Sequence, residues 1–203
     1  MERPTGGRTR SRAVEAKAIN NKVARSFSKR YVCYPKSDSH KRFLLGERGS
    51  RNLIAIGLNP SSADAQELDP TSKNIKALAL QNDCDGWFLL NLYPQRTPKP
   101  KNLPTKPNSV LMRENLHFIN SFLTQNKSVA KIVFCWGNFI DHLPYLRESR
   151  DALFQLAKQQ AWPCYSMGIT QRCHPIHPSP LAVNRIFGGI HKACLHPFVV
   201  RMD

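Results

Sequence analysis

The sequence predicts an α/β protein: a three-layer α/β/α sandwich around a central sheet of four mostly parallel strands. Four short apolar runs are typical of buried strands, and segments with helical periodicity separate them. This alternation is the pattern that parallel sheets require, because each parallel connection needs a crossover. The four runs span residues 53–57, 86–92, 131–137 and 164–169.

The first strand leads into a turn and then a helix. The run L-I-A-I-G at 53–57 breaks into the turn L-N-P-S-S at 58–62. Asp69 is a suitable helix N-cap because its carboxylate can accept a backbone N–H, and Pro70 suits the first helical position. We therefore expect a helix from Pro70 onward.

The remaining elements repeat this alternation. The second strand leads into a loop rich in Pro and Lys over residues 93–108. Apolar residues then recur every three or four positions, which indicates helices, and the helix after the third strand is interrupted before Pro144. The helical segments expected here are 109–125, 138–160 and one that starts at Leu181.

The charge of the chain points to its partners. The 203 residues include 30 Lys and Arg against 14 Asp and Glu, a formal net charge of +16. Such a charge indicates polyanions first and a membrane surface second. Residues 1–30 alone hold nine basic and two acidic residues. We expect a basic arm over residues 1–42, partly disordered or helical, that is a nucleic-acid-binding segment, a solvated tail or a mitochondrial transit peptide.

Several other features narrow the class of protein. No run approaches the roughly 18 apolar residues of a spanning helix, and the N-terminus has no apolar signal-peptide core. A cytoplasmic protein without a membrane partner is therefore expected. The six cysteines include no C-x-x-C pair, which is typical of reduced thiols and not of a disulfide framework or a zinc ribbon.

The segment R-C-H-P-I-H-P at 172–178 holds two histidines next to a cysteine, which could ligate a metal. Its two prolines break the helix that would bring these side chains onto one face, so we expect no metal and no cofactor. A stiff Pro-rich turn that starts a helix instead suits a phosphate, through backbone N–H groups and the Ser179 hydroxyl.

The ends of the four predicted strands carry polar groups. In open parallel sheets, chemistry collects at the carboxyl ends of the strands. These ends are G-L-N-P-S at 57–61, N-L-Y-P at 91–94, W-G-N at 136–138 and the segment 168–180. A site is therefore predicted where these segments converge.

Four of these segments resemble signature motifs of the uracil-DNA glycosylase superfamily. They are, in the order of that family, 57–61 (G-L-N-P-S), 89–92 (L-L-N-L), 132–137 (I-V-F-C-W-G) and 177–185 (H-P-S-P-L-A-V-N-R). The first has the form found in the mismatch-specific and thymine-DNA branch. The resemblance covers about residues 43–197 and implies a glycosylase-like α/β domain over residues 43–203. The N-P-S, D-P-T and N-L-Y segments also resemble a family of uncharacterised bacterial and phage domains, a candidate offshoot of the superfamily.

The resemblance implies roles for three residues. Asn59 stands where the family positions water with an aspartate or, in the mismatch branch, an asparagine; an amide is no general base, so catalysis would depend on orienting the water. Asn91 would hydrogen-bond the edge of an extruded base, and His177 would stabilise charge on O2 of that base. Their structural alternatives are a turn residue, a strand-end cap and a histidine packed between prolines.

Four further residues receive roles in the same way. Ser61 stands where many members have a tyrosine that screens C5 of the pyrimidine, so a 5-substituted pyrimidine is expected to fit. Ser179 and Arg185 would contact DNA phosphates. Leu181 would wedge into the base stack, unless it is the first core residue of its helix. The cysteine spacing of the iron–sulfur branches is absent, so no cluster is expected.

The predicted function is a monofunctional DNA glycosylase. It would extrude a uracil-like or 5-modified pyrimidine and hydrolyse its N-glycosidic bond to leave an abasic site, in DNA repair or phage defence. The expected partner is DNA, bound by a monomer. Either Asp64 or Asp69 could supply the carboxylate that Asn59 lacks, although Asp69 is favoured as a helix cap, and the sequence leaves this open. The alternatives are a nucleic-acid-binding module with weak catalysis, and an enzyme acting on modified RNA bases or nucleosides.

Overall fold

The computed structural model describes residues 31–200. Most of the expected basic arm therefore lies outside the described residues, while its residues 32–34 form the first strand. The helices and strands in chain order are β1 (Val32–Tyr34), β2 (Leu44–Glu47), β3 (Asn52–Gly57), α2 (Pro70–Leu80), β4 (Gly86–Asn91), α3 (Ser109–Gln125), β5 (Val129–Phe134), α4 (Pro144–Gln159), β6 (Cys164–Ser166), α5 (Pro180–Phe187) and β7 (His196–Pro197). Short 3-10 helices lie at Pro100–Asn102, Asn138–His142 and Ile190–Lys192.

One mixed sheet runs through the described part of the chain, with its seven strands in the order β1-β2-β4-β3-β5-β6-β7. The α/β class is confirmed, but the expectation of a four-stranded sheet is wrong. The four expected strands do run parallel at the centre, whereas β1 and β2 add antiparallel pairs at one edge and β7 at the other. These extra strands have three, four and two residues, too few for an apolar run to stand out.

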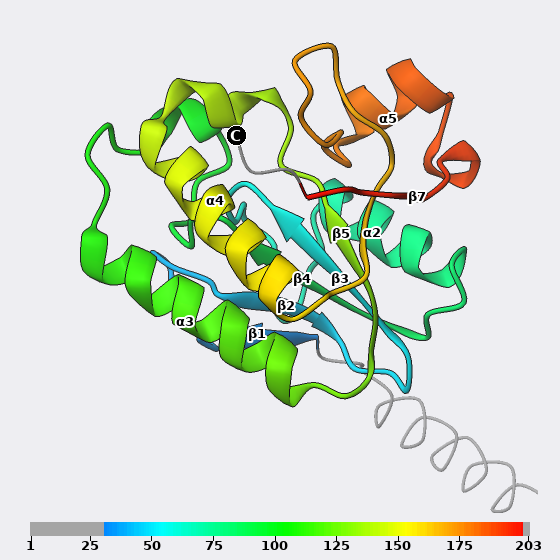
Figure 1. Cartoon of the computed structure of the whole chain (residues 1–203), viewed down its shortest axis with the longest axis horizontal. Helices are drawn as coiled ribbons and strands as arrows, with labels where there is room; N and C mark the ends of the chain where they lie inside the picture. Colours follow the sequence, from blue (N-terminus) through cyan, green and yellow to red (C-terminus); the bar gives the residue numbers. More distant parts are fainter. Residues whose placement is uncertain (1–30, 201–203) are drawn as a thin grey trace, which may run out of the picture. The chain divides into compact units, whose positions relative to one another are not determined.

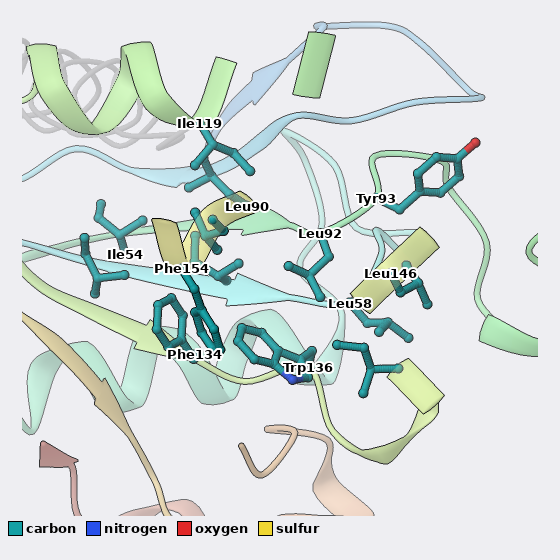
Figure 2. Close-up of a cluster of buried hydrophobic side chains, with 14 of the residues drawn as sticks. Ile54, Leu58, Leu90, Leu92, Tyr93, Ile119, Phe134, Trp136, Leu146 and Phe154 are labelled. Atoms are coloured by element: carbon teal, nitrogen blue, oxygen red, sulfur yellow. The ribbon is translucent and has the colours of Figure 1, made fainter. Parts of the chain in front are cut away.

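Helices cover both faces of this sheet (Figure 1). Side chains of α3 and α4 pack on one face and those of α2 on the other, so the fold has three layers. Alternate residues of β3 divide between the two cores, as the period of two in a strand requires. Figure 2 shows the core under α3 and α4, where Trp136 packs against Phe134 and Phe154 with ring centroids 5.1 and 5.8 Å apart.

The helix starts follow the expected local chemistry. Asp69 caps α2, since its Oδ1 accepts a hydrogen bond from the backbone N–H of Ser72 at 2.7 Å. Pro70 takes the first helical position, where a missing N–H costs nothing. The interruption before Pro144 is also confirmed: a 3-10 turn ends at His142, and α4 begins at Pro144. None of the helices in residues 31–200 is both long and apolar enough to cross a membrane.

The order of the central strands creates a crevice. From β3 the chain passes through α2 to β4 on one side, and it then returns through α3, on the opposite face, to β5 on the other side of β3. The connections that leave β3 and β5 therefore diverge to opposite faces. Such a switch point leaves an opening beyond the carboxyl ends of the strands, which is where ligands bind in open α/β sheets.

Candidate active site

A cavity of about 360 Å³ lies at this crevice. Its walls come from the segments that follow β3, β4 and β5, from the start of α2 and from the turn before α5. We call it the main cavity. Its volume falls within the roughly 300–1,000 Å³ that small-molecule sites occupy. The carboxyl ends of three parallel strands therefore converge on one hollow, as the sequence pattern predicts.

Asn59 and Ser61 enter this cavity from the loop after β3. The Asn59 side-chain Nδ2 donates to the backbone oxygens of Thr97 at 2.9 Å and Pro60 at 3.0 Å. The backbone N–H of Thr97 donates in turn to Pro60 at 2.8 Å, so the two loops are joined. These hydrogen bonds fix the orientation of the Asn59 amide. Its Nδ2 is used within the protein, so Oδ1 is the atom that can accept a hydrogen bond from a ligand or a water.

Asn91 ends β4 and lies at the cavity wall with 2% of its surface exposed. Asn115 donates to its backbone oxygen at 2.8 Å and so anchors the strand end from α3. The Asn91 side-chain Nδ2 is buried without a hydrogen-bond partner among residues 31–200. An unsatisfied buried amide costs free energy of about 1–3 kcal/mol, so this donor is a candidate to bind a ligand acceptor.

His177 lines the cavity from the turn before α5. Its Nδ1 accepts a hydrogen bond from the backbone N–H of Ser179 at 3.1 Å. Burial lowers the pKa of His177 to about 4, against the opposing charge of Asp69. The imidazole is therefore neutral at pH 7, and because Nδ1 accepts, the proton sits on Nε2. His177 thus offers the cavity an uncharged N–H donor.

Gly137 makes room for this histidine. It follows β5 with a φ of +73°, a conformation that residues with a Cβ atom rarely adopt. A Cβ atom built on Gly137 would lie 3.0 Å from Cβ of His177. A glycine at position 137, after the third predicted strand, is therefore explained by the backbone conformation of this residue and by its closeness to His177.

The sequence offered two carboxylates, Asp64 and Asp69, that could assist Asn59, and only Asp69 lines the main cavity. Asp69 lines the main cavity while its Oδ1 caps α2. Asp64 is exposed and lies outside this cavity, and its Oδ1 accepts hydrogen bonds from the backbone N–H groups of Gln66 and Glu67, which lower its pKa. Asp69 is therefore both a helix cap and the carboxylate of the main cavity, next to the wall that holds Asn59 and His177.

The three expected DNA-contacting residues lie on α5 or at its start. Ser179 caps the helix by accepting from the backbone N–H of Ala182 at 3.4 Å, and it also lines the main cavity. Leu181 is 79% exposed, so the alternative that it is the first core residue of α5 is wrong; Val183 is the buried residue of this helix. Arg185 is exposed as well.

Sequence reasoning missed Arg42, which lines the main cavity with only 1% of its surface exposed. Nothing in the pattern K-R-F separates this arginine from the many surface arginines of a basic chain. Its burial results from the approach of the loop after β3, whose Ala63 oxygen accepts from Arg42 Nη1 at 2.6 Å. Such a long-range contact leaves no trace in local sequence.

The segment 172–178 does not form a metal centre in the described structure. His174 Nε2 lies 2.8 Å from Asp141, and Cys173 is exposed. Within residues 31–200, no three His, Cys, Asp or Glu side chains are grouped so that they could hold a metal ion.

These features define an α/β domain with a polar cavity at the carboxyl edge of its parallel strands. The chain belongs to the family described as "Protein of unknown function (DUF1643)", which matches residues 42–179. Every residue that lines the main cavity falls within this range, whereas Leu181 and Arg185 lie beyond it. No curated protein and no solved structure matched the chain.

Proposed function

We propose that the protein is a DNA glycosylase that extrudes a pyrimidine and hydrolyses its N-glycosidic bond. One observation carries this proposal: Asn59, Asn91 and His177, which come from three distant segments, line a single cavity. Each has the polar group that its proposed role requires. The resemblance of the four motifs to uracil-DNA glycosylases supports the same reaction.

Base recognition is assigned to Asn91. Its Nδ2 has no partner among the described residues, so a carbonyl oxygen or ring nitrogen of a base would satisfy it. The Asn91 oxygen can accept from an N–H of the same base, since an amide offers a donor and an acceptor side by side. A flat ring with both groups on one edge, such as a pyrimidine, matches this pattern.

His177 acts as the donor to the leaving base. As the bond between C1′ of the sugar and the base nitrogen breaks, its electron pair leaves on the base and negative charge develops on O2. A neutral Nε2–H placed against O2 stabilises that charge without transferring a proton. A preorganised donor of this kind contributes about 2.7–4 kcal/mol to catalysis in enzymes that use one.

Water is oriented by Asn59 and Asp69. The Asn59 Oδ1 accepts one hydrogen bond from the water, and the Asp69 carboxylate accepts another. The water oxygen adds to C1′ as the base departs, and its proton passes to Asp69 or to solvent. Asp69 thereby supplies the charge that the amide of Asn59 lacks.

The exposed surface around α5 would meet the DNA. Ser179 and Arg185 suit phosphates through a hydroxyl and a guanidinium, and the exposed Leu181 has the apolar side chain that a wedge requires. The formal charge of +16 favours the same partner.

The decisive experiment is incubation of the full chain with duplexes that contain uracil, thymine or 5-substituted cytosines, followed by alkaline cleavage at abasic sites. We expect cleavage of at least one duplex, with turnover lost in Asn59→Ala and His177→Ala while DNA affinity stays within about threefold, because these residues act on the reacting atoms. Binding without any abasic product would contradict the proposal and favour a nucleic-acid-binding module.

A further inference from the structure

Arg42 is a buried cation that forms no ion pair with any residue of the described range 31–200. It lies between β1 and β2, and Nη1 donates to the Ala63 oxygen at 2.6 Å. Nε and Nη2 have no hydrogen-bond partner, and none of the ion pairs within residues 31–200 includes this guanidinium. Burial lowers the pKa of Arg42 to about 10, so it is still charged at neutral pH.

A second guanidinium lies beside it. Arg96 Nη1 donates to the same Ala63 oxygen at 2.9 Å and to Ser61 at 3.4 Å, and its Nε has no partner among the described residues. The charge of Arg96 lowers the pKa of Arg42 further, while Asp69, Cys33 and Asp64 oppose this in part. Two like charges on one carbonyl oxygen are a cost to stability, because buried charges are stable only when paired.

The two arginines stand between two hollows. Arg42 lines the main cavity, and Arg96 lines an adjoining hollow of about 420 Å³. The two hollows share Ser61 and Pro98 as wall residues. The second hollow is also lined by Lys36 and by two carboxylates, Asp38 and Asp64. The unpartnered donors of Arg42 therefore belong to a residue of the main cavity, whose wall also includes Ser61.

We propose that Arg42, assisted by Arg96, binds an oxyanion of the substrate, a carboxylate or a phosphate, at the wall shared by the two hollows. The two unpartnered donors, Nε–H and Nη2–H, lie on the same edge of the guanidinium and point in parallel, a geometry that matches two oxygens of one anion. Both donor atoms are covered in the structure, so binding requires the guanidinium to turn towards the cavity that it already lines.

Two sources can supply this anion, and both rest on the proposed function. One is an acidic substituent at C5 of the extruded pyrimidine, which would extend past Ser61. The other is a phosphate of the DNA backbone next to the extruded nucleotide. The chemistry recognised is the same in both, and the two differ in how an Arg42 substitution affects different duplexes.

The test compares Arg42→Met with Arg48→Met in the full chain. Arg48 is exposed and follows β2 near the start of β4, whereas the cavity lies at the carboxyl ends of the parallel strands. Its substitution therefore makes the same change in charge away from the cavity. Melting temperature is measured with inorganic phosphate against chloride at equal ionic strength. We expect phosphate to raise the melting temperature of the unmodified protein and of Arg48→Met, and we expect Arg42→Met to lose this shift.

Duplex affinity then separates the two sources. If the anion is on the base, the unmodified protein binds a duplex with 5-carboxyuracil about tenfold tighter than one with 5-hydroxymethyluracil, and Arg42→Met removes the difference. If the anion is a backbone phosphate, Arg42→Met weakens both duplexes equally and lowers the salt dependence of binding by about one phosphate contact. Either result supports the proposal.

The proposal is overturned if phosphate does not stabilise the unmodified protein, or if Arg42→Met keeps both its phosphate shift and its affinities. Should Arg42→Met fail to fold, Arg42→Lys carries the test: it keeps the charge, loses the paired donors, and is expected to weaken the phosphate shift. These readouts need no turnover. A protein that excises no base can therefore still pass this test, and a glycosylase can still fail it.

Discussion

Gly57 and Asn91 lie directly opposite each other, at the last register position of the parallel pair β3 and β4. A Cβ atom built on Gly57 would lie 2.9 Å from Oδ1 of Asn91. The glycine at the start of G-L-N-P-S therefore leaves the space in which the amide of a different motif is held. The segments 57–61 and 89–92 are therefore in contact, because the Asn91 side chain lies against the backbone of Gly57.

Gly57→Ala is expected to displace the Asn91 amide and to weaken base binding. Because alanine restricts the unfolded chain and Gly57 does not have a positive φ, we expect the free energy of unfolding to change by less than about 1 kcal/mol. Affinity for a duplex with an extruded, non-hydrolysable pyrimidine nucleotide should fall about tenfold. Fluorescence anisotropy and urea unfolding measure the two quantities.

The control is a double-mutant cycle with Asn91→Ala. If Gly57 acts through Asn91, the double variant binds no more weakly than Asn91→Ala alone. Additive losses would show that the glycine acts on the site by another route.

The partly buried His177 predicts a specific dependence of stability on pH. Its pKa is lowered from 6.5 to about 4 in the folded protein, so the fold favours the neutral form. The contribution of His177 to the free energy of unfolding is therefore fully present above pH 6.5. It is lost progressively as the pH falls from 6.5 to 4, by up to about 3 kcal/mol. Urea unfolding across this range measures the loss.

His177→Gln should remove this part of the pH dependence, because glutamine does not titrate. His117→Gln, on the exposed side of α3, serves as the matched control and should keep the dependence of the unmodified protein. Activity, where it is found, should show no ionisation of His177 near pH 6.5. A pH profile that falls near 6.5 and is abolished by His177→Gln would contradict the burial of this imidazole.

Asp69 caps α2 and, in the proposed reaction, also orients the water, and one substitution separates these two roles. Asparagine caps helices as well as aspartate does, so Asp69→Asn is expected to keep the free energy of unfolding within about 0.5 kcal/mol. It removes the charge that is proposed to orient the water, and we expect the rate of base release to fall by about 10²-fold or more. Single-turnover kinetics and thermal unfolding give the two values.

Two further variants complete this comparison. Asp69→Ala removes both the cap and the charge, so it should lose about 1 kcal/mol of stability in addition to the rate. Asp64→Asn lies outside the main cavity and should keep the rate. Equal rates in Asp69→Asn and the unmodified protein would assign Asp69 to the cap alone.

The sequence was sufficient for the elements with strong local signals. The runs at 53–57 and 86–92 are apolar because β3 and β4 are buried on both faces, and the Asp69-Pro70 pair marks the start of α2. The short edge strands β1 and β7 were not predicted. They have three and two residues, and their pairing depends on neighbours distant in sequence.

The candidate site likewise contains residues that a local sequence pattern indicates and residues that it does not. Asn59, Asn91 and His177 were predictable because each follows a strong apolar run or lies within a Pro-rich turn, where polar groups stand out. Arg42 was not, because its burial arises only when the loop at Ala63 folds over it. The neutral state of His177 was equally hidden, since it depends on the burial that the cavity walls create.

Leu181 offers a test in which stability and function are cleanly separated. Its side chain is 79% exposed at the start of α5, so Leu181→Ala should change the free energy of unfolding by less than about 0.5 kcal/mol. If the leucine fills the gap left by an extruded base, the variant should bind and process duplex DNA more weakly, because extrusion from a duplex costs a few kcal/mol. Single-stranded DNA with the same base should be affected little, since it has no stack to open. Val199→Ala, at a residue that is 70% exposed and outside the main cavity, is the control and should leave both substrates unchanged. Equal losses on single and double strands would assign Leu181 to general DNA contact and not to the wedge.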